Sequence, residues 1–134
     1  MKRIVETDAA PAAVGAYSQA ATDGSLLFTA GQIALTPDGE MIEGSIGEQT
    51  RQALENVEAV LEADGASLED VLKISVYLAD IEEYGEMNDV YEDFFDESPP
   101  ARSAFAVGEL PKGAGVEIEA IATVENGGYG SADG

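Results

Sequence analysis

The chain has 134 residues, of which 45% are hydrophobic, so it is long enough for one folded domain with a buried core. It contains 27 acidic and 6 basic residues, a formal net charge of -21, and this excess of negative charge disfavours binding to nucleic acid. It has neither cysteine nor histidine, which excludes disulfides, thiolate chemistry, a Ser-His-Asp triad and a histidine-bearing zinc site.

No apolar stretch approaches the length of about 20 residues that a membrane-spanning helix needs. The first residues, MKRIVETDAAPAAV, lack the continuous apolar run of a secretory leader. We therefore expect a cytoplasmic protein with no membrane partner. The acidity also suggests a halophilic protein, adapted to a salt-rich cytoplasm, because salt screens the repulsion between carboxylates.

Apolar periodicity, turn residues and capping signals define the expected elements. Ser45 and Glu48 have the spacing of a capping box, and Asp80 is the candidate N-cap of a second helix. In chain order we expect a strand (26–35), a turn (36–39), a helix that stops at Gly65, a strand (71–79), a helix that ends at the prolines 99–100, a strand (101–107), a turn (110–113) and a strand (115–124). We interpret this as β-β-α-β-α-β-β: one mixed α+β domain over 1–125, with both helices on one sheet face and a flexible tail at 126–134.

Two of these strands have faces of different character. The strand 71–79 alternates, with an apolar face formed by Leu72, Ile74, Val76 and Leu78. Its other face mixes residue types and carries Lys73, Ser75, Tyr77 and Ala79. The strand 115–124 has a similar mixed face, formed by Glu117, Glu119, Ile121 and Thr123. Such a face is either an oligomer surface or an exposed face with scattered apolar residues, and the pattern alone does not separate the two.

The acid–base groups left without histidine and cysteine are carboxylates, lysine and tyrosine. Arg102, in SPPARSAFAV, carries a planar fork that can bind a carboxylate, although an ion pair with an acidic side chain is the ordinary alternative. Glu117 and Glu119 are either exposed charges or include a partly buried base. Tyr17 lies in a loop of small residues and is either a pocket wall or a core residue. The acidic run 89–97 lacks the spacing of a calcium loop, so we expect no metal site.

Several stretches, in this order, resemble the RidA/YjgF family of reactive-intermediate imine deaminases. They are PAAVGAYSQA, FTAGQIAL, RQALENVEAVLEADGASLEDVLKISVYLADIEEYGEMNDVYEDFF and PPARSAFAVGELPKGAGVEIEAIA. Together they extend from about Ala10 to Val124. The resemblance implies a chorismate-mutase-like (YjgF-like) fold that assembles as a homotrimer, with sites in the clefts between subunits. It would also explain the mixed sheet face as a surface inside the trimer.

The resemblance further implies roles for particular residues. Arg102 would grip the carboxylate of a small 2-imino acid, and Glu119 would position the attacking water. Tyr17 would line the pocket from the neighbouring subunit, Gly31 would supply backbone polar groups, and Asn88 would make a minor contribution. The implied reaction is hydrolysis of 2-aminoacrylate-type 2-imino acids to 2-keto acids and ammonia, without a metal or an organic cofactor.

Two positions depart from the family pattern. Many relatives have cysteine where this chain has Ala104, so thiol chemistry is absent there. Relatives usually have proline where this chain has Ala16, which loosens the loop that carries Tyr17. Two other functions stay open: a non-catalytic binder of small carboxylates, and a chaperone-like protein that acts through its acidic surface. Ribonuclease activity, attributed to some relatives, is disfavoured by the charge and by the absence of histidine.

Overall fold

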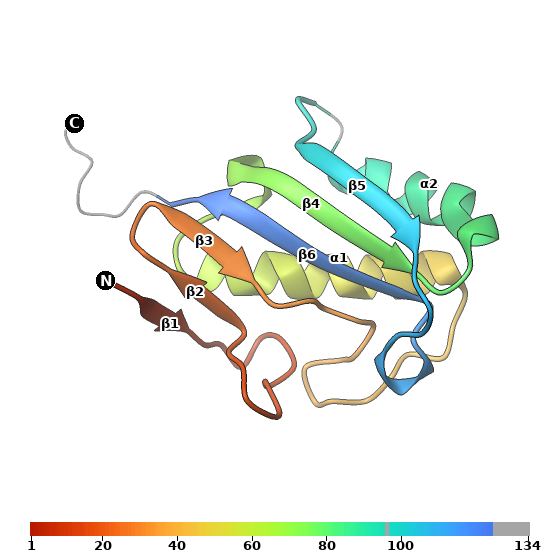
Figure 1. Cartoon of the computed structure of the whole chain (residues 1–134), viewed down its shortest axis with the longest axis horizontal. Coiled ribbons are helices and arrows are strands. Elements are labelled where there is room, and N and C mark those ends of the chain that lie inside the picture. The colour runs from red at the N-terminus through yellow and green to blue at the C-terminus, as the bar shows by residue number, and fades with distance from the viewer. Residues whose placement is uncertain (96, 125–134) are drawn as a thin grey trace.

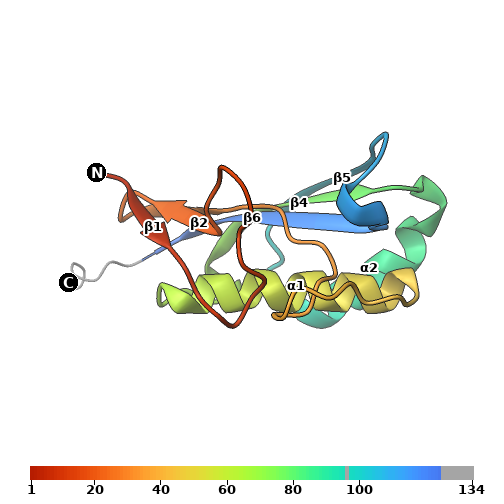
Figure 2. The same ribbon diagram turned by 90° about the horizontal axis from the view of Figure 1, so that it is seen from below.

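The computed structural model describes residues 1–95 and 97–124, which form a six-stranded sheet in the order β1-β2-β3-β6-β4-β5. Two α-helices within these residues lie against one face of the sheet, and the opposite face is open (Figures 1 and 2). The strands are β1 (Arg3–Val5), β2 (Ala20–Thr22), β3 (Leu26–Thr29), β4 (Val71–Leu78), β5 (Ala101–Ala106) and β6 (Val116–Thr123). The helices are α1 (Ile46–Ala63) and α2 (Tyr84–Phe94). The tail expected at 126–134 lies outside the described residues.

The mixed α+β architecture with both helices on one face is confirmed, but the predicted order was one strand short. Three strands, and not two, precede α1. β1 and β2 have only 3 residues each, and the sequence of β2, Ala-Ala-Thr, carries almost no apolar signal. These strands form because β1 pairs with β2 and β2 pairs with β3. No local sequence pattern reveals this pairing.

The prediction of a strand over 26–35 is wrong in its second half, because β3 ends at Thr29. Phe28 pairs with Ile121, but Gln32 pairs with Ile118, so the β3 side carries one more residue than β6 between these pairs. The Thr29 hydroxyl accepts the Ala120 N–H at 3.0 Å in place of a backbone carbonyl. The resulting bulge lifts Gly31 out of the ladder, next to the mixed face of β6.

A second irregularity, at the start of β4, makes the predicted apolar face of this strand wrong at Leu72. The register between β4 and β6 shifts between Val71 and Lys73. Leu72 is consequently 52% exposed, and Val71 takes the buried place predicted for it. From Ile74 onward the alternation is as predicted, with Ile74, Val76 and Leu78 buried under the helices.

The capping signals are confirmed at both helix starts, with one refinement. Ser45 accepts the Glu48 N–H and Glu48 accepts the Ser45 N–H, so the capping box of α1 is complete. Asp80 caps a single 3-10 turn, Ile81–Glu83, and α2 begins only after it. These caps fix where each helix enters the face that it covers.

The segment after β3 is anchored to α1 by a buried asparagine. Asn56 is 1% exposed, and its Nδ2 donates to the carbonyls of Ile33 and Leu35 at 3.2 and 2.8 Å. We expect Asn56→Ala to lower the free energy of unfolding by about 1–3 kcal/mol, because the Leu35 carbonyl loses its donor and the Ile33 carbonyl keeps only the N–H of Leu35. Urea unfolding measures this. A loss below about 0.5 kcal/mol would mean that water replaces the amide.

Acidic side chains on α1 are expected to make the stability of the fold depend on salt. Burial and then the charges of Glu62 and Glu55 raise the pKa of Glu58, so ionised Glu58 increasingly opposes folding as pH rises through its titration range. We expect Glu58→Gln to stabilise the fold near neutral pH by about 0.2–0.5 kcal/mol per removed pair in about 0.1 M KCl. The gain should shrink in about 2 M KCl, where these charges are screened. Urea midpoints at both salt concentrations test this, and a gain independent of salt would contradict it. Adaptation to a salt-rich cytoplasm itself stays a prediction.

None of the helices in the described part of the chain is long and apolar enough to cross a bilayer.

Candidate functional site

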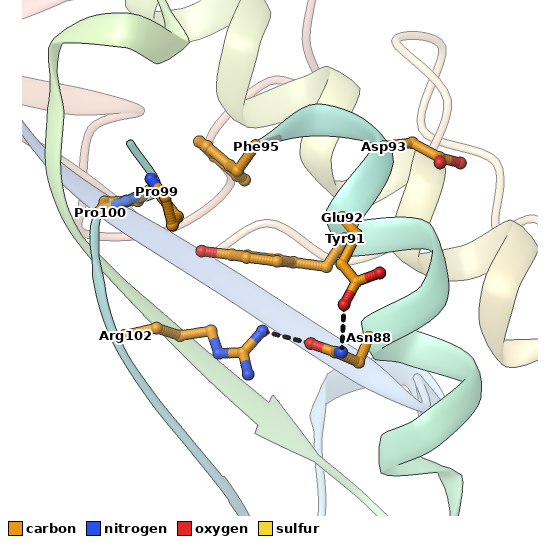
Figure 3. A pocket seen from close by; sticks show the side chains of 8 residues that line it. All are labelled: Asn88, Tyr91, Glu92, Asp93, Phe95, Pro99, Pro100 and Arg102. Atoms are coloured by element: carbon orange, nitrogen blue, oxygen red, sulfur yellow. Dashed lines mark hydrogen bonds between the residues drawn. The ribbon is translucent and has the colours of Figure 1, made fainter. Parts of the chain in front are cut away.

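Arg102 lies on the edge strand β5 and points to the helix-covered side of the sheet. It pairs with buried Ile74 in the parallel β4–β5 ladder, and its side chain extends toward α2 (Figure 3). Its Nη1 donates to Asn88 Oδ1 at 2.7 Å, and its Nη2 donates to the hydroxyl of Tyr84. The guanidinium carbon also lies 4.6 Å from the centroid of the Tyr91 ring. Arg102 and Asn88, both among the predicted site residues, are therefore brought together within one chain.

The spacing of residues on α2 builds this contact. Tyr84, Asn88 and Tyr91 are separated by four and three residues, so they share the helix face turned toward β5. Asn88 Nδ2 donates to Glu92 Oε2 at 3.1 Å, so the amide oxygen is left for Arg102. The guanidinium is thus held by one amide oxygen, one hydroxyl and an aromatic face. Neither hydrogen bond uses a carboxylate, so the positive charge is not neutralised by them.

A cavity of about 730 Å³ lies beside Arg102 (Figure 3). Its lining consists of Asn88, Tyr91, Glu92, Asp93, Phe95, Pro99, Pro100 and Arg102. The Tyr91 side chain is 4% exposed, and its hydroxyl has no hydrogen-bond partner among the described residues. Burial raises the pKa of Tyr91 to about 12, so this hydroxyl stays protonated. It can therefore donate a hydrogen bond to an acceptor in the cavity. The cavity combines the Arg102 cation and the Tyr91 hydroxyl with the acidic side chains of Glu92 and Asp93, so Arg102 and Tyr91 are the groups that suit a small carboxylate.

Glu119 lies on the other, open face of the sheet. The Tyr77 hydroxyl donates to Glu119 Oε2 at 2.8 Å, and the Tyr77 ring meets Phe105 edge-on at 5.4 Å. Glu117 is on the same face, and burial followed by the charge of Glu119 raises its pKa. A Cβ added to Gly31 would lie 2.2 Å from Glu117 Oε2, so the glycine allows this carboxylate to approach the backbone.

The two predicted catalytic residues do not meet within one chain. Glu119 pairs with Ser75, and Ser75 pairs with Ser103, so these side chains share the open face. Arg102 is the neighbour of Ser103 and points to the opposite face, because successive side chains in a strand alternate. The strand β4 also lies between β6 and β5. A site that uses both Arg102 and Glu119 therefore needs two chains.

Tyr17 and Gly31 lie on the open face of the sheet, and Arg102 lies on the helix-covered face. Tyr17 is 54% exposed, and its hydroxyl accepts the Val14 N–H at 3.4 Å. With Phe28 and Ala30 it lines a hollow of about 540 Å³ over β2 and β3. The N–H and C=O of Gly31 make no hydrogen bond with any described residue, so they are available to a ligand. Tyr17 is thus a surface residue and not a core tyrosine.

The site contains three tyrosines whose roles the sequence analysis did not assign: Tyr77, Tyr84 and Tyr91. Tyr84 and Tyr91 lie four and three residues from Asn88 on α2, and this spacing was the signal that could have linked them to the site. Tyr77 was placed on the mixed face of β4. Only the register of β4 against β6 shows that it reaches Glu119.

Known proteins have a similar sequence and the same fold. The family model described as endoribonuclease L-PSP matches residues 7–124. A RutC family protein of Pyrococcus horikoshii is 52% identical over 126 residues, covering 93% of this chain and 100% of that protein. A Rattus norvegicus protein named 2-iminobutanoate/2-iminopropanoate deaminase is 42% identical over 123 residues, covering 91% of this chain and 90% of that protein. The crystal structure of E. coli TdcF with bound serine superposes with a TM-score of 0.88 at 40% identity, over 92% of this chain and 99% of that chain.

The chain belongs to the endoribonuclease L-PSP family, which contains the RidA/YjgF proteins. The six-stranded sheet with two helices is the fold of the solved relatives. Imine deaminase is the activity named for several relatives of about 43% identity, which supports this enzyme class at the level of the family.

Proposed function

We propose that this protein hydrolyses 2-aminoacrylate-type enamines, as their 2-imino acid tautomers, to 2-keto acids and ammonia. The observation that carries the proposal is the setting of Arg102, a half-buried guanidinium beside a cavity, oriented by Asn88 and Tyr84 without a neutralising carboxylate. Its fork binds the substrate carboxylate. The Tyr91 hydroxyl is placed to add a further hydrogen bond.

Glu119 acts on the water and transfers its protons. In the first step the water oxygen bonds to the imine carbon, Glu119 takes a proton from that oxygen, and the imine nitrogen receives it. The product is a carbinolamine. In the second step Glu119 moves the hydroxyl proton to nitrogen, the C–N bond breaks, the C=O bond forms and ammonia leaves. Imines already hydrolyse in water, so positioning of the water and the imine supplies most of the acceleration.

The complete site takes Arg102 and Asn88 from one protomer and Glu119 from a neighbour in a homotrimer. The opposite faces occupied by Arg102 and Glu119 support this arrangement. The open face also exposes Phe28 and Phe105, which are 51% and 48% exposed in the single chain. Apolar side chains on an otherwise polar sheet face favour contact with another chain. Tyr17 and Gly31, on the same side of the sheet as Phe28, would then line the site from the neighbour.

A second candidate is a non-catalytic binder of small carboxylates. The Arg102 cavity favours it, because this cavity forms completely without Glu119. The two functions differ in what Glu119 does: a binder keeps its affinity and never turns over its ligand. The description of the family also names endoribonuclease activity. A net charge of -21 opposes the approach of an RNA backbone to this protein.

The test of the proposal is release of ammonia from freshly generated 2-iminobutyrate. We expect the wild-type protein to accelerate ammonia release and to form 2-ketobutyrate in equal amount. A small carboxylate such as 2-ketobutyrate should inhibit competitively, because it occupies Arg102. Binding of 2-ketobutyrate in calorimetry with no acceleration of imine loss would favour the carboxylate binder. Absence of both binding and acceleration would contradict both functions.

A further inference from the structure

The open face of the sheet contains a hydrogen bond that the proposed reaction does not yet explain. The Tyr77 hydroxyl donates to Oε2 of Glu119 at 2.8 Å. A carboxylate has only acceptors, so the phenol is the donor, and one oxygen of Glu119 is occupied by it. The other oxygen, Oε1, has no hydrogen-bond donor among the described residues and is left for a water.

The register of the sheet explains why this pair can form. Tyr77 lies directly opposite Glu117, and Ser75 lies directly opposite Glu119. Tyr77 therefore reaches Glu119 along the diagonal, a separation that an aromatic side chain can bridge. Its ring is held from the other side by Phe105 of β5, at 5.4 Å and edge-on. Three adjacent strands, β6, β4 and β5, thus fix the hydroxyl in place.

The other groups on this face show why a neutral hydroxyl suits Glu119 as a hydrogen-bond donor. Glu117 lies two residues away on the same face. Lys73, opposite Ile121 and four residues from Tyr77, is the other titratable residue that β4 adds to this face. β5 contributes the uncharged residues Ser103 and Phe105 to this face. The hydrogen bond to Glu119 is the largest cause of the raised pKa of Tyr77, so the phenol keeps its proton. A neutral donor can hold a carboxylate here without adding charge.

We propose that Tyr77 is a positioning residue for the reaction: its hydroxyl fixes Oε2 of Glu119 so that Oε1 faces the attacking water in the ionised state. This inference rests on the proposed function. Tyr77 touches neither the substrate nor the transferred protons, and it acts through Glu119 alone. Loss of the hydroxyl frees Oε2, so the carboxylate can rotate and Oε1 is no longer held toward the water.

The test is Tyr77→Phe, which keeps the ring and its contact with Phe105. We expect kcat for 2-iminobutyrate to fall about tenfold and KM to change less than about twofold, because Arg102 is untouched. A purely structural residue would change stability without producing this split between kcat and KM. Tyr84→Phe is the matched comparison, since it removes the same atom beside Arg102 and should act mainly on KM, whereas Tyr77→Phe should act mainly on kcat. Wild-type kcat in Tyr77→Phe would overturn the inference.

A readout without turnover separates this inference from the proposed function. In protein labelled with ¹³Cζ-tyrosine, the Tyr77 signal, assigned by its loss in Tyr77→Phe, should titrate at higher pH in wild type than in Glu119→Gln. If wild type fails to hydrolyse imines while this difference is present, the proposed function fails and the Tyr77–Glu119 pair stands. Identical titrations in both proteins would overturn the pair itself.

Discussion

Arg102→Ala is expected to lower kcat/KM for 2-iminobutyrate by roughly 100- to 1000-fold, mostly through a higher KM. The guanidinium is the one cation that lines the cavity in the described residues, and its two forked hydrogen bonds to a carboxylate are lost together. Steady-state ammonia release measures the effect. The fold should persist, because Arg102 bonds only to Asn88 and Tyr84 at the edge of the sheet.

Arg102→Lys is the matched control for this result. Lysine keeps the charge but presents a single point donor, so it should recover only part of the lost affinity. It also cannot reach Asn88 and Tyr84 with the same fork. Equal activity of wild type, Arg102→Lys and Arg102→Ala would remove Arg102 from substrate binding.

Glu119→Gln is expected to lower kcat by about 100-fold or more, with KM nearly unchanged, because the variant cannot accept a proton from water. Glutamine has the shape of glutamate, and its amide oxygen can still accept from Tyr77, so the sheet should be preserved. Calorimetry with 2-ketobutyrate should show wild-type affinity. Single-turnover measurements with 2-iminobutyrate separate this loss from slow product release.

The contrary outcome for Glu119 is specific. Wild-type kcat in Glu119→Gln would mean that water attacks without this carboxylate. Glu117, whose pKa is raised by burial and by Glu119, would then be the remaining acid–base group on the open face. Glu117→Gln in the same assay decides between the two positions, since it should reduce turnover less than Glu119→Gln if the proposed mechanism holds.

Much of the fold could be predicted because strong local patterns coincide with the real elements. The capping box at Ser45 and the alternation of β6 both appear in the structure as expected. The errors lie where the pattern is weak or interrupted. The bulge beside Thr29 and the shift at Leu72 arise from pairing with β6, which is distant in sequence.

The roles of the candidate site residues stay predictions, and their arrangement in space could not be predicted from the sequence. Asn88 was expected to make a minor contribution to the site, and in the structure it contacts Arg102. The side of the sheet that Arg102 occupies depends on its pairing with Ile74, and β5 has too many small residues for its own pattern to reveal this. The separation of Arg102 from Glu119 could therefore be recognised only from the structure.

The most direct test of a site shared between chains is to mix two inactive variants. Arg102→Ala and Glu119→Gln protomers are unfolded, combined in equal amounts and refolded together, and ammonia release from 2-iminobutyrate is measured. In a cyclic trimer, each mixed assembly restores one intact pair of Arg102 and Glu119, so random mixing predicts recovery of about a quarter of wild-type activity. Refolding each variant alone provides the baseline. If the mixture forms mixed oligomers by native mass spectrometry but stays as inactive as either variant, the two residues do not work across a subunit boundary.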